Sequence, residues 1–187
     1  KASDTARLLL NQGGAGHIPV QKIPGQLTDH YDPRKKTLSL SEDVHDSSSI
    51  AALGIAAHEA GHALQHNTHY GPLMLRNSVY PVVNIGSTLA FPLFFVGFIA
   101  GTGVRVLMDI GILLFTFAVF FSVITLPVEF NASKRAVALL EERGFLNRQE
   151  IGGAKAVLSA AALTYVAATA MAVVQLVRLL ILRDSRD

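Results

Sequence analysis

The sequence predicts a mostly α-helical membrane protein that also contains a small β-sheet or hairpin. Half of its 187 residues are hydrophobic and its mean hydropathy is +0.39, and both values are high for a soluble globular protein. The chain divides near Arg76 into a polar N-terminal part and a largely apolar remainder. That remainder holds three apolar stretches, each long enough to cross a bilayer.

The polar part begins with a short amphipathic helix, which we expect at residues 3–12. Ser3 or Asp4 is suited to cap its start, because both side chains accept hydrogen bonds from free backbone N–H groups. Gly13 and Gly14 follow the helix and end it.

A small β-structure follows, in a region that carries several prolines and glycines. The alternating residues Thr37-Leu38-Ser39-Leu40 predict one half-buried strand. Gln26–Pro33 precedes it and runs into a turn, so we expect this segment to supply the partner strand.

A second helix is expected from Ile50 to Gln65. Ser47-Ser48-Ser49 gives a strong start signal, because serine caps a helix N-terminus well. The stretch has no proline, is rich in alanine and carries His58-Glu59-Ala60-Gly61-His62 near its middle.

The three apolar stretches run over residues 79–100, 106–128 and 157–182. Each reaches the roughly 20 residues that cross about 30 Å of hydrocarbon as a helix. The alternative is a soluble helical bundle, but core helices are usually shorter and keep a polar face, which the second stretch almost lacks. We therefore expect three transmembrane helices, in which the prolines of the first two are tolerated.

Between the second and third spans, residues 129–156 are polar. The pattern predicts a helix that continues from the second span and stops at Gly144. This gives four parts: a polar part at 1–78, two transmembrane helices at 79–128, the helical segment at 129–156, and a last span with its tail at 157–187.

Basic residues predict the orientation in the membrane. Residues 1–78 hold seven Lys or Arg and residues 129–156 hold five, whereas the loop Gly101–Arg105 holds only Arg105. The tail beyond the last span holds Arg183 and Arg186. The positive-inside rule therefore places the polar part and the 129–156 segment together in the cytoplasm.

Composition excludes several classes of partner and chemistry. The net charge is only +2 and no dense basic run carries interleaved aromatic residues, so nucleic acid is not an expected partner. The chain has no cysteine. Disulfides, thiolate metal ligands and a cysteine nucleophile are therefore all excluded within this sequence.

His58-Glu59-Ala60-Gly61-His62 matches the pattern H-E-x-x-H. Positions i and i+4 share one helix face, so His58 and His62 can hold one zinc ion through their imidazoles. Glu59 lies beside the metal, where it can take a proton from zinc-bound water. The alternative is a chance match of surface histidines, but such polar groups in an apolar helix are costly unless they are paired.

Such a site needs a third protein ligand, and two acidic residues beside the spans are candidates. Glu129 begins the segment after the second span, and Asp109 lies near the start of that span. About 20 residues separate them, or roughly 30 Å on one helix, so both cannot reach the same ion. Glu129 lies on the histidines' side of the bilayer if their helix is cytoplasmic. Asp109 has another explanation, since an acid near a helix N-terminus is stabilised by the helix dipole.

Taken together, these residues resemble the bacterial YugP-like family of neutral, integral-membrane zinc metallopeptidases. The resemblance extends over nearly the whole chain. It rests on QLTDHYDPR (Gln26–Arg34), LSLSEDVHDSSSIAALGIAAHEAGHALQH (Leu38–His66), TLPVEFNASKRA (Thr125–Ala136) and AALTYVAA (Ala161–Ala168).

The family looks like a gluzincin, whose third zinc ligand is a Glu on a later helix. The resemblance therefore implies a gluzincin-type zinc-peptidase core with His58, His62 and Glu129 as the Zn²⁺ ligands and Glu59 as the general base.

Related membrane gluzincins often carry an Asp four residues after the ligand Glu, where it holds a zinc-binding histidine. Here that position is Ser133, with Asn131 nearby, and a neutral partner orients an imidazole less strongly than a carboxylate does. Family members also begin with a further membrane helix, which we expect to precede Lys1.

The expected function is that of a membrane-anchored zinc metalloendopeptidase in the cell membrane, with its active site at the cytoplasmic face and a peptide or protein as substrate. An extended peptide could dock beside the Thr37–Leu40 strand. Tyr165, inside the third span, is a candidate donor to the oxyanion; a hydroxyl bonded to a neighbouring helix is the alternative.

Two other functions stay open at this point. One is a site-2-type intramembrane zinc protease that uses Asp109 as its third ligand, although Ile50–Gln65 is short for a span. The other is a non-catalytic membrane scaffold with a structural zinc. Three His or acidic ligands with an additional Glu beside them favour a catalytic site over the scaffold alternative, since a structural zinc ion is usually bound by four protein ligands.

Overall fold

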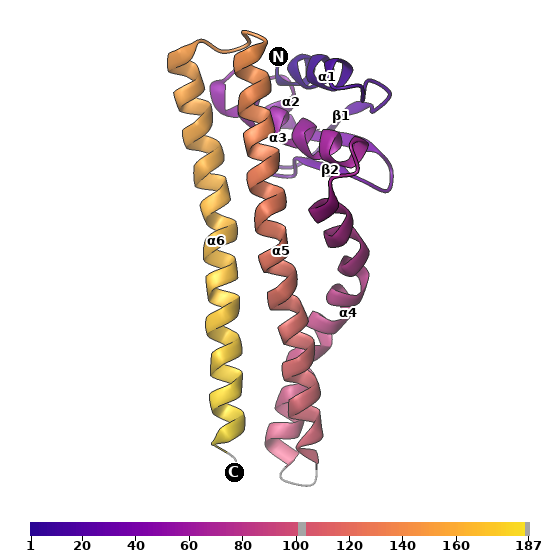
Figure 1. Ribbon diagram of the computed structural model, residues 1–187, viewed down its shortest axis with the longest axis vertical. Helices are drawn as coiled ribbons and strands as arrows, with labels where there is room; N and C mark the ends of the chain where they lie inside the picture. The colour runs from indigo at the N-terminus through magenta and orange to yellow at the C-terminus, as the bar shows by residue number, and fades with distance from the viewer. Residues whose placement is uncertain (101–103, 186–187) are drawn as a thin grey trace. The chain divides into compact units, whose positions relative to one another are not determined.

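A computed structural model describes residues 1–100 and 104–185 of the chain, and most of its elements are labelled in Figure 1. The expected loop Gly101–Arg105 and the tail residue Arg186 fall partly or wholly outside the described residues. The chain forms two compact units. The first unit comprises Lys1–Leu73 and Val128–Leu163, and the second comprises Met74–Pro127 and Thr164–Asp187.

The first helix, α1, spans Ala2–Gln12, as the sequence predicts. The expected cap is wrong, because Ser3 and Asp4 lie inside the helix and Lys1 occupies the N-cap without a side-chain bond. Gly13 follows the helix, and Gly14 adopts a φ of 74°, which a glycine reaches without steric cost.

The sheet has three strands: β1 (Val20–Ile23), β2 (His30–Asp32) and β3 (Thr37–Ser41). The strand order is β1-β3-β2, with β1 parallel and β2 antiparallel to β3. The strand at Thr37–Leu40 and its partner within Gln26–Pro33 are therefore confirmed, while β1 is an additional strand. Because β3 is the central strand, it has no free edge, and the expected docking of a peptide beside Thr37–Leu40 is wrong.

A short helix, α2 (Glu42–His45), leads to the motif helix α3 (Ile50–Asn67). Ser49 is the N-cap of α3, and its side chain accepts a hydrogen bond from the Ala52 N–H. The serine start signal is thereby confirmed, since this bond satisfies one of the free donors of the first turn.

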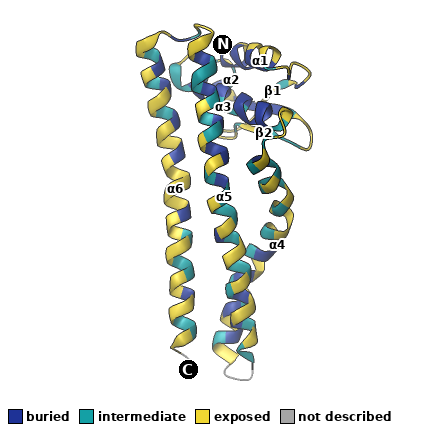
Figure 2. Cartoon of the chain, in the orientation of Figure 1, coloured by how far each residue is buried: buried dark blue, intermediate teal, exposed yellow. Residues whose placement is uncertain are grey.

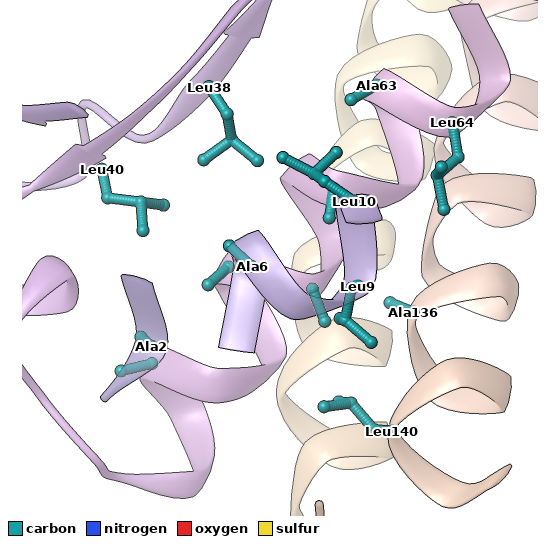
Figure 3. Close-up of a cluster of buried hydrophobic side chains, with 14 of the residues drawn as sticks. Ala2, Ala6, Leu9, Leu10, Leu38, Leu40, Ala63, Leu64, Ala136 and Leu140 are labelled. Carbon is teal, nitrogen blue, oxygen red and sulfur yellow. The ribbon is translucent and has the colours of Figure 1, made fainter. Parts of the chain in front are cut away.

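The core of the first unit joins α1, β3, α3 and the C-terminal part of α5. Figure 3 shows its side chains converging, and they are fully or nearly fully buried: Leu9, Leu10, Leu38, Leu40, Leu64 and Leu140. Burial of one such leucine contributes about 1.5–3 kcal/mol. This packing fixes α3 against the sheet on one side and α5 on the other.

Three long helices complete the chain: α4 (Gly71–Ala100), α5 (Val106–Glu142) and α6 (Arg148–Asp184). All three are long and apolar enough to cross a membrane, as expected. The helix predicted to continue past the second span is confirmed, because α5 runs without a break to Glu142 and Gly144 follows with a φ of 66°.

The second unit exposes large apolar side chains. Figure 2 shows α4 and α6 with much of their surface exposed, and Ile99 and Met171 are 78% and 66% exposed. Exposed apolar surface of this extent is costly in water and favourable in lipid. The chain as a whole is mostly helical, with a small sheet and three helices suited to span a bilayer.

Candidate metal centre

Gly61 allows α3 and α5 to approach closely. A Cβ atom built on Gly61 would lie 2.7 Å from the carbonyl oxygen of Ala132 on α5. Such a contact is too short for any side chain, so the close approach requires glycine. The face of α3 that carries the two motif histidines thereby meets the part of α5 that follows Val128.

His58, His62 and Glu129 come together at this contact, from α3 and α5. His58 Nε2 and His62 Nε2 lie 3.1 Å apart. Glu129 Oε2 lies 3.2 Å from the first nitrogen and 3.3 Å from the second. Glu129 is 2% exposed, so its carboxylate depends on nearby cationic or hydrogen-bonding groups.

The other ring nitrogen of each histidine meets an oxygen atom. His58 Nδ1 lies 3.0 Å from Ser133 Oγ, and His62 Nδ1 lies 3.0 Å from Gln65 Oε1. Gln65 Oε1 can only accept, so the His62 Nδ1 carries the ring proton and Nε2 presents a lone pair. In the same tautomer, His58 Nε2 presents a second lone pair beside that of His62 Nε2. Two lone pairs next to a carboxylate repel one another unless a cation lies among them.

The donor set fits a zinc ion. Ligands at about 2.0–2.1 Å from a tetrahedral zinc lie roughly 3.3–3.4 Å from one another. The three separations of 3.1, 3.2 and 3.3 Å are close to that value. Two imidazoles and one carboxylate leave the fourth position for water or substrate, which is the arrangement of catalytic rather than structural sites.

The charges around His62 also favour a cation. Burial disfavours the charged form of His62, but the hydrogen bond to Glu129 and the negative charges of Glu59 and Glu129 outweigh it. The pKa of His62 is therefore raised above its usual value. A site that stabilises positive charge in a buried place is suited to bind a metal cation.

Gln65 connects the two helices behind His62. Its side chain is fully buried, and its Nε2 donates 2.9 Å bonds to the Val128 carbonyl and to Asn131 Oδ1 on α5. Asn131 Oδ1 also accepts a 2.8 Å bond from Arg135 Nε. The orientation of His62 is thus held through Gln65 by α5 itself. The sequence pattern does not reveal this, although the i+3 spacing from His62 to a polar residue in an apolar helix is a usable signal.

Glu59 lies between the two histidines in sequence and contacts the sheet. Its Oε2 accepts a 2.9 Å hydrogen bond from the backbone N–H of Tyr31 on β2. The Tyr31 hydroxyl lies 2.7 Å from Nδ1 of His66, one turn of α3 beyond His62. The edge strand β2 therefore positions the candidate general base, a contact that spacing along the chain does not predict.

The remaining sequence candidates are placed as follows. Ser133 and Asn131 both lie at the centre, the first against His58 and the second against Gln65. Asp109 belongs to the second unit and forms an ion pair with Arg183. Tyr165 also belongs to the second unit, and its role as an oxyanion donor stays a prediction.

The fold combines three helices that are long and apolar enough to cross a membrane with a His/His/Glu set that could hold a metal ion. The chain belongs to the family described as "Putative neutral zinc metallopeptidase", whose model matches residues 1–184. It is 47% identical over 186 residues to "Putative membrane protease YugP" of Bacillus subtilis (strain 168). The aligned region covers 99% of this chain and 82% of that protein. No solved structure shows a significant match to the chain.

Proposed function

We propose that this chain is a membrane-anchored zinc metalloendopeptidase whose active site is built on α3 and α5. The observation that carries the proposal is the convergence of His58, His62 and Glu129, with donor separations that suit zinc. Membership of a zinc metallopeptidase family and the identity to a protein named as a membrane protease support the same conclusion.

His58, His62 and Glu129 would hold the ion, and Ser133 and Gln65 would orient the two imidazoles. When bound, zinc supplies a Lewis acid that polarises the scissile carbonyl and lowers the pKa of a water molecule. The protein's own part of the reaction is to position these groups and to move protons.

Glu59 is the proposed general base. It takes a proton from the attacking water as the new C–O bond forms, and it passes that proton to the amine nitrogen as the C–N bond breaks. The Tyr31 N–H holds Oε2, and Oε1 has no hydrogen-bond partner among the residues that the structure describes. That oxygen is therefore available for the proton transfer.

The substrate would bind in extended form along the outer edge of β2, the edge that does not pair with β3. This edge faces α3, since the N–H of Tyr31 is directed to Glu59 rather than to β3. A peptide on this edge passes the candidate base. A cleft of about 580 Å³ between α5 and α6 borders the metal centre at Ser133 and is lined mostly by apolar residues, such as Phe130 and Leu158. It could receive an apolar side chain of the substrate.

The proposed location is the cell membrane, with residues 1–78 and 129–156 at the cytoplasmic face. The distribution of basic residues supports this orientation. A peptide in the cytoplasm or at the cytoplasmic boundary of the bilayer is then the substrate.

A cleavage assay with metal removal tests the proposal. The full chain, purified in detergent or lipid, should cleave casein or a peptide library, stop when a chelator removes the metal and recover when zinc is restored. A zinc-loaded protein that cleaves no peptide would support a scaffold with a structural zinc and contradict the proposal.

A further inference from the structure

A second cavity lies next to the metal centre, at the end of α3 and the turn between β2 and β3. Its volume is about 100 Å³, and its walls include Tyr31, Lys36, His66, Asn67 and His69 together with His17. A carboxylate and one or two water molecules would fit, because one water occupies about 30 Å³. Tyr31 joins the cavity to the centre, since its N–H bonds Glu59 and its hydroxyl contacts His66.

The cavity is lined by basic groups. Among the residues that the structure describes, the ionisable side chains that line it are Lys36, three histidines and the Tyr31 phenol, with no carboxylate. Burial lowers the pKa of His66, and the nearby Lys36 and His69 lower it further. The positive charge of Lys36 therefore favours an anion in the cavity.

The cavity also offers hydrogen-bond donors to an anion. Burial and the neighbouring Asp32 raise the pKa of Tyr31 to about 12, so its phenol stays protonated. The phenol can donate to His66 Nδ1, and that tautomer carries the ring proton on Nε2. Neutral His66 can then act as a donor, beside the amide of Asn67 and the ammonium of Lys36.

Two walls of the cavity have an unusual backbone. Lys36 and His69 have φ angles of 52° and 51°, a conformation that residues with a Cβ seldom adopt. Leu27 is the only other such non-glycine residue in the described part of the chain. Strained backbone of this kind is concentrated at binding and catalytic sites, so its occurrence at two walls of one cavity supports a functional role.

We propose that this pocket binds a carboxylate of the peptide substrate and so gives the enzyme a preference for peptides that carry a carboxylate near the cleaved bond. The inference rests on the proposed peptidase function. The carboxylate has two sources, an Asp or Glu side chain or the C-terminus of the substrate. A peptide lying along the outer edge of β2 beside Glu59 would bring either one to the pocket.

Matched peptides test the proposal with the zinc-loaded full chain. One series compares Asp or Glu with Asn or Gln at each position around the cleaved bond, and a second compares a free with an amidated C-terminus. In one of the two series, the wild type should cleave the member that carries the carboxylate with a kcat/KM roughly tenfold or more higher, as loss of a hydrogen bond to a charged group implies. The series that shows the difference identifies the source of the carboxylate.

The variant Lys36→Asn/His69→Asn removes two of the cavity's basic side chains and places there residues that tolerate the left-handed backbone. Its ratio of acidic to neutral kcat/KM should fall towards one. Each single variant gives a second reading if the double variant does not fold. Lys35→Asn is the matched control, because Lys35 is exposed and does not line the cavity, and it should keep the wild-type ratio.

The possible results distinguish failure of the pocket proposal from failure of the proposed peptidase function. A zinc-loaded wild type that cleaves none of the peptides overturns the proposed function and the pocket's role together. Cleavage without a preference for the carboxylate in either series, or a preference that both Asn substitutions leave unchanged, overturns the pocket alone and leaves the peptidase function standing.

Discussion

At the residue scale, the metal centre depends on which atoms the two histidines present to each other. Ser133 and Gln65 hold the Nδ1 atoms, so both Nε2 atoms face Glu129. In the proposed centre, zinc binding and histidine orientation therefore belong to different residues, and removing a ligand should have a larger effect than removing its support.

The third ligand is the first assignment to test. Glu129→Gln keeps the size of the side chain but removes the charge beside both histidines. It should weaken zinc binding by more than the roughly 10- to 100-fold that loss of a ligand's hydrogen-bonding partner costs. The zinc content of the purified variants measures this.

Asp109→Asn is the matched control, because it also neutralises one acid on α5. Asp109 pairs with Arg183 in a partly exposed contact, and such a pair contributes little to stability. The variant should retain zinc. If Asp109→Asn loses the metal and Glu129→Gln keeps it, the site-2-type assignment is correct and the centre described above is not.

The sequence predicts the ligand residues better than their surroundings. His58, Glu59 and His62 stand in one motif, and Glu129 comes from the family resemblance. Gln65 and Tyr31 were not identified as parts of the site. Their partners are distant in sequence, Asn131 for Gln65 and Glu59 for Tyr31, so only the folded chain brings them together.

At the element scale, the spacing between α3 and α5 determines whether Glu129 can reach the histidines. Gly61 sets that spacing, because its missing side chain leaves room for the Ala132 carbonyl. The centre is thus built from two helices that must stay close, rather than from one helix and a flexible loop.

Gly61→Ala should push the two helices apart. The added methyl group would meet the Ala132 carbonyl oxygen at 2.7 Å, and overpacking of this kind costs about 1–3 kcal/mol. We expect a lower unfolding temperature together with weaker zinc binding. Thermal unfolding with and without zinc measures both effects.

Gly54→Ala in the same helix provides the comparison. A Cβ there would meet its nearest neighbour at 3.8 Å, an ordinary contact, so the variant should be as stable as the wild type or slightly more stable. Equal behaviour of the two variants would show that the α3–α5 approach does not hold the centre together.

Helices are predicted more accurately from this sequence than strands. The serine cap of α3 and the long apolar runs are local signals, and the structure confirms them. The sheet order is not local. β1 pairs directly with β3 in parallel, although β2 lies between them in the sequence. Alternation within Thr37–Leu40 therefore could not show that this strand is central.

At the scale of the whole molecule, the sequence predicts which parts lie in the membrane and on which side. Three helices have the length and hydropathy of membrane spans. Their direction rests on the basic residues alone, since apolar length carries no information about sidedness.

Cysteine labelling tests the orientation, because the chain contains no cysteine of its own. Lys35→Cys, Glu142→Cys and Ser185→Cys place single thiols at exposed positions. In cells where the reagent reaches only the external face of the cell membrane, a membrane-impermeant maleimide should label only Ser185→Cys. In inverted membrane vesicles, the same reagent should label the other two variants. The reverse pattern would place the metal centre on the external face.

Catalysis by Glu59 is the central claim, and Glu59→Gln tests it most directly. Glutamine has the same shape and its carbonyl oxygen can still accept the Tyr31 N–H, so the fold and the three zinc ligands stay in place. Zinc content and peptide cleavage should be measured on the same sample. We predict wild-type zinc content and a cleavage rate reduced about 10²- to 10⁴-fold. A zinc-loaded Glu59→Gln protein that cleaves peptide at the wild-type rate would contradict the account.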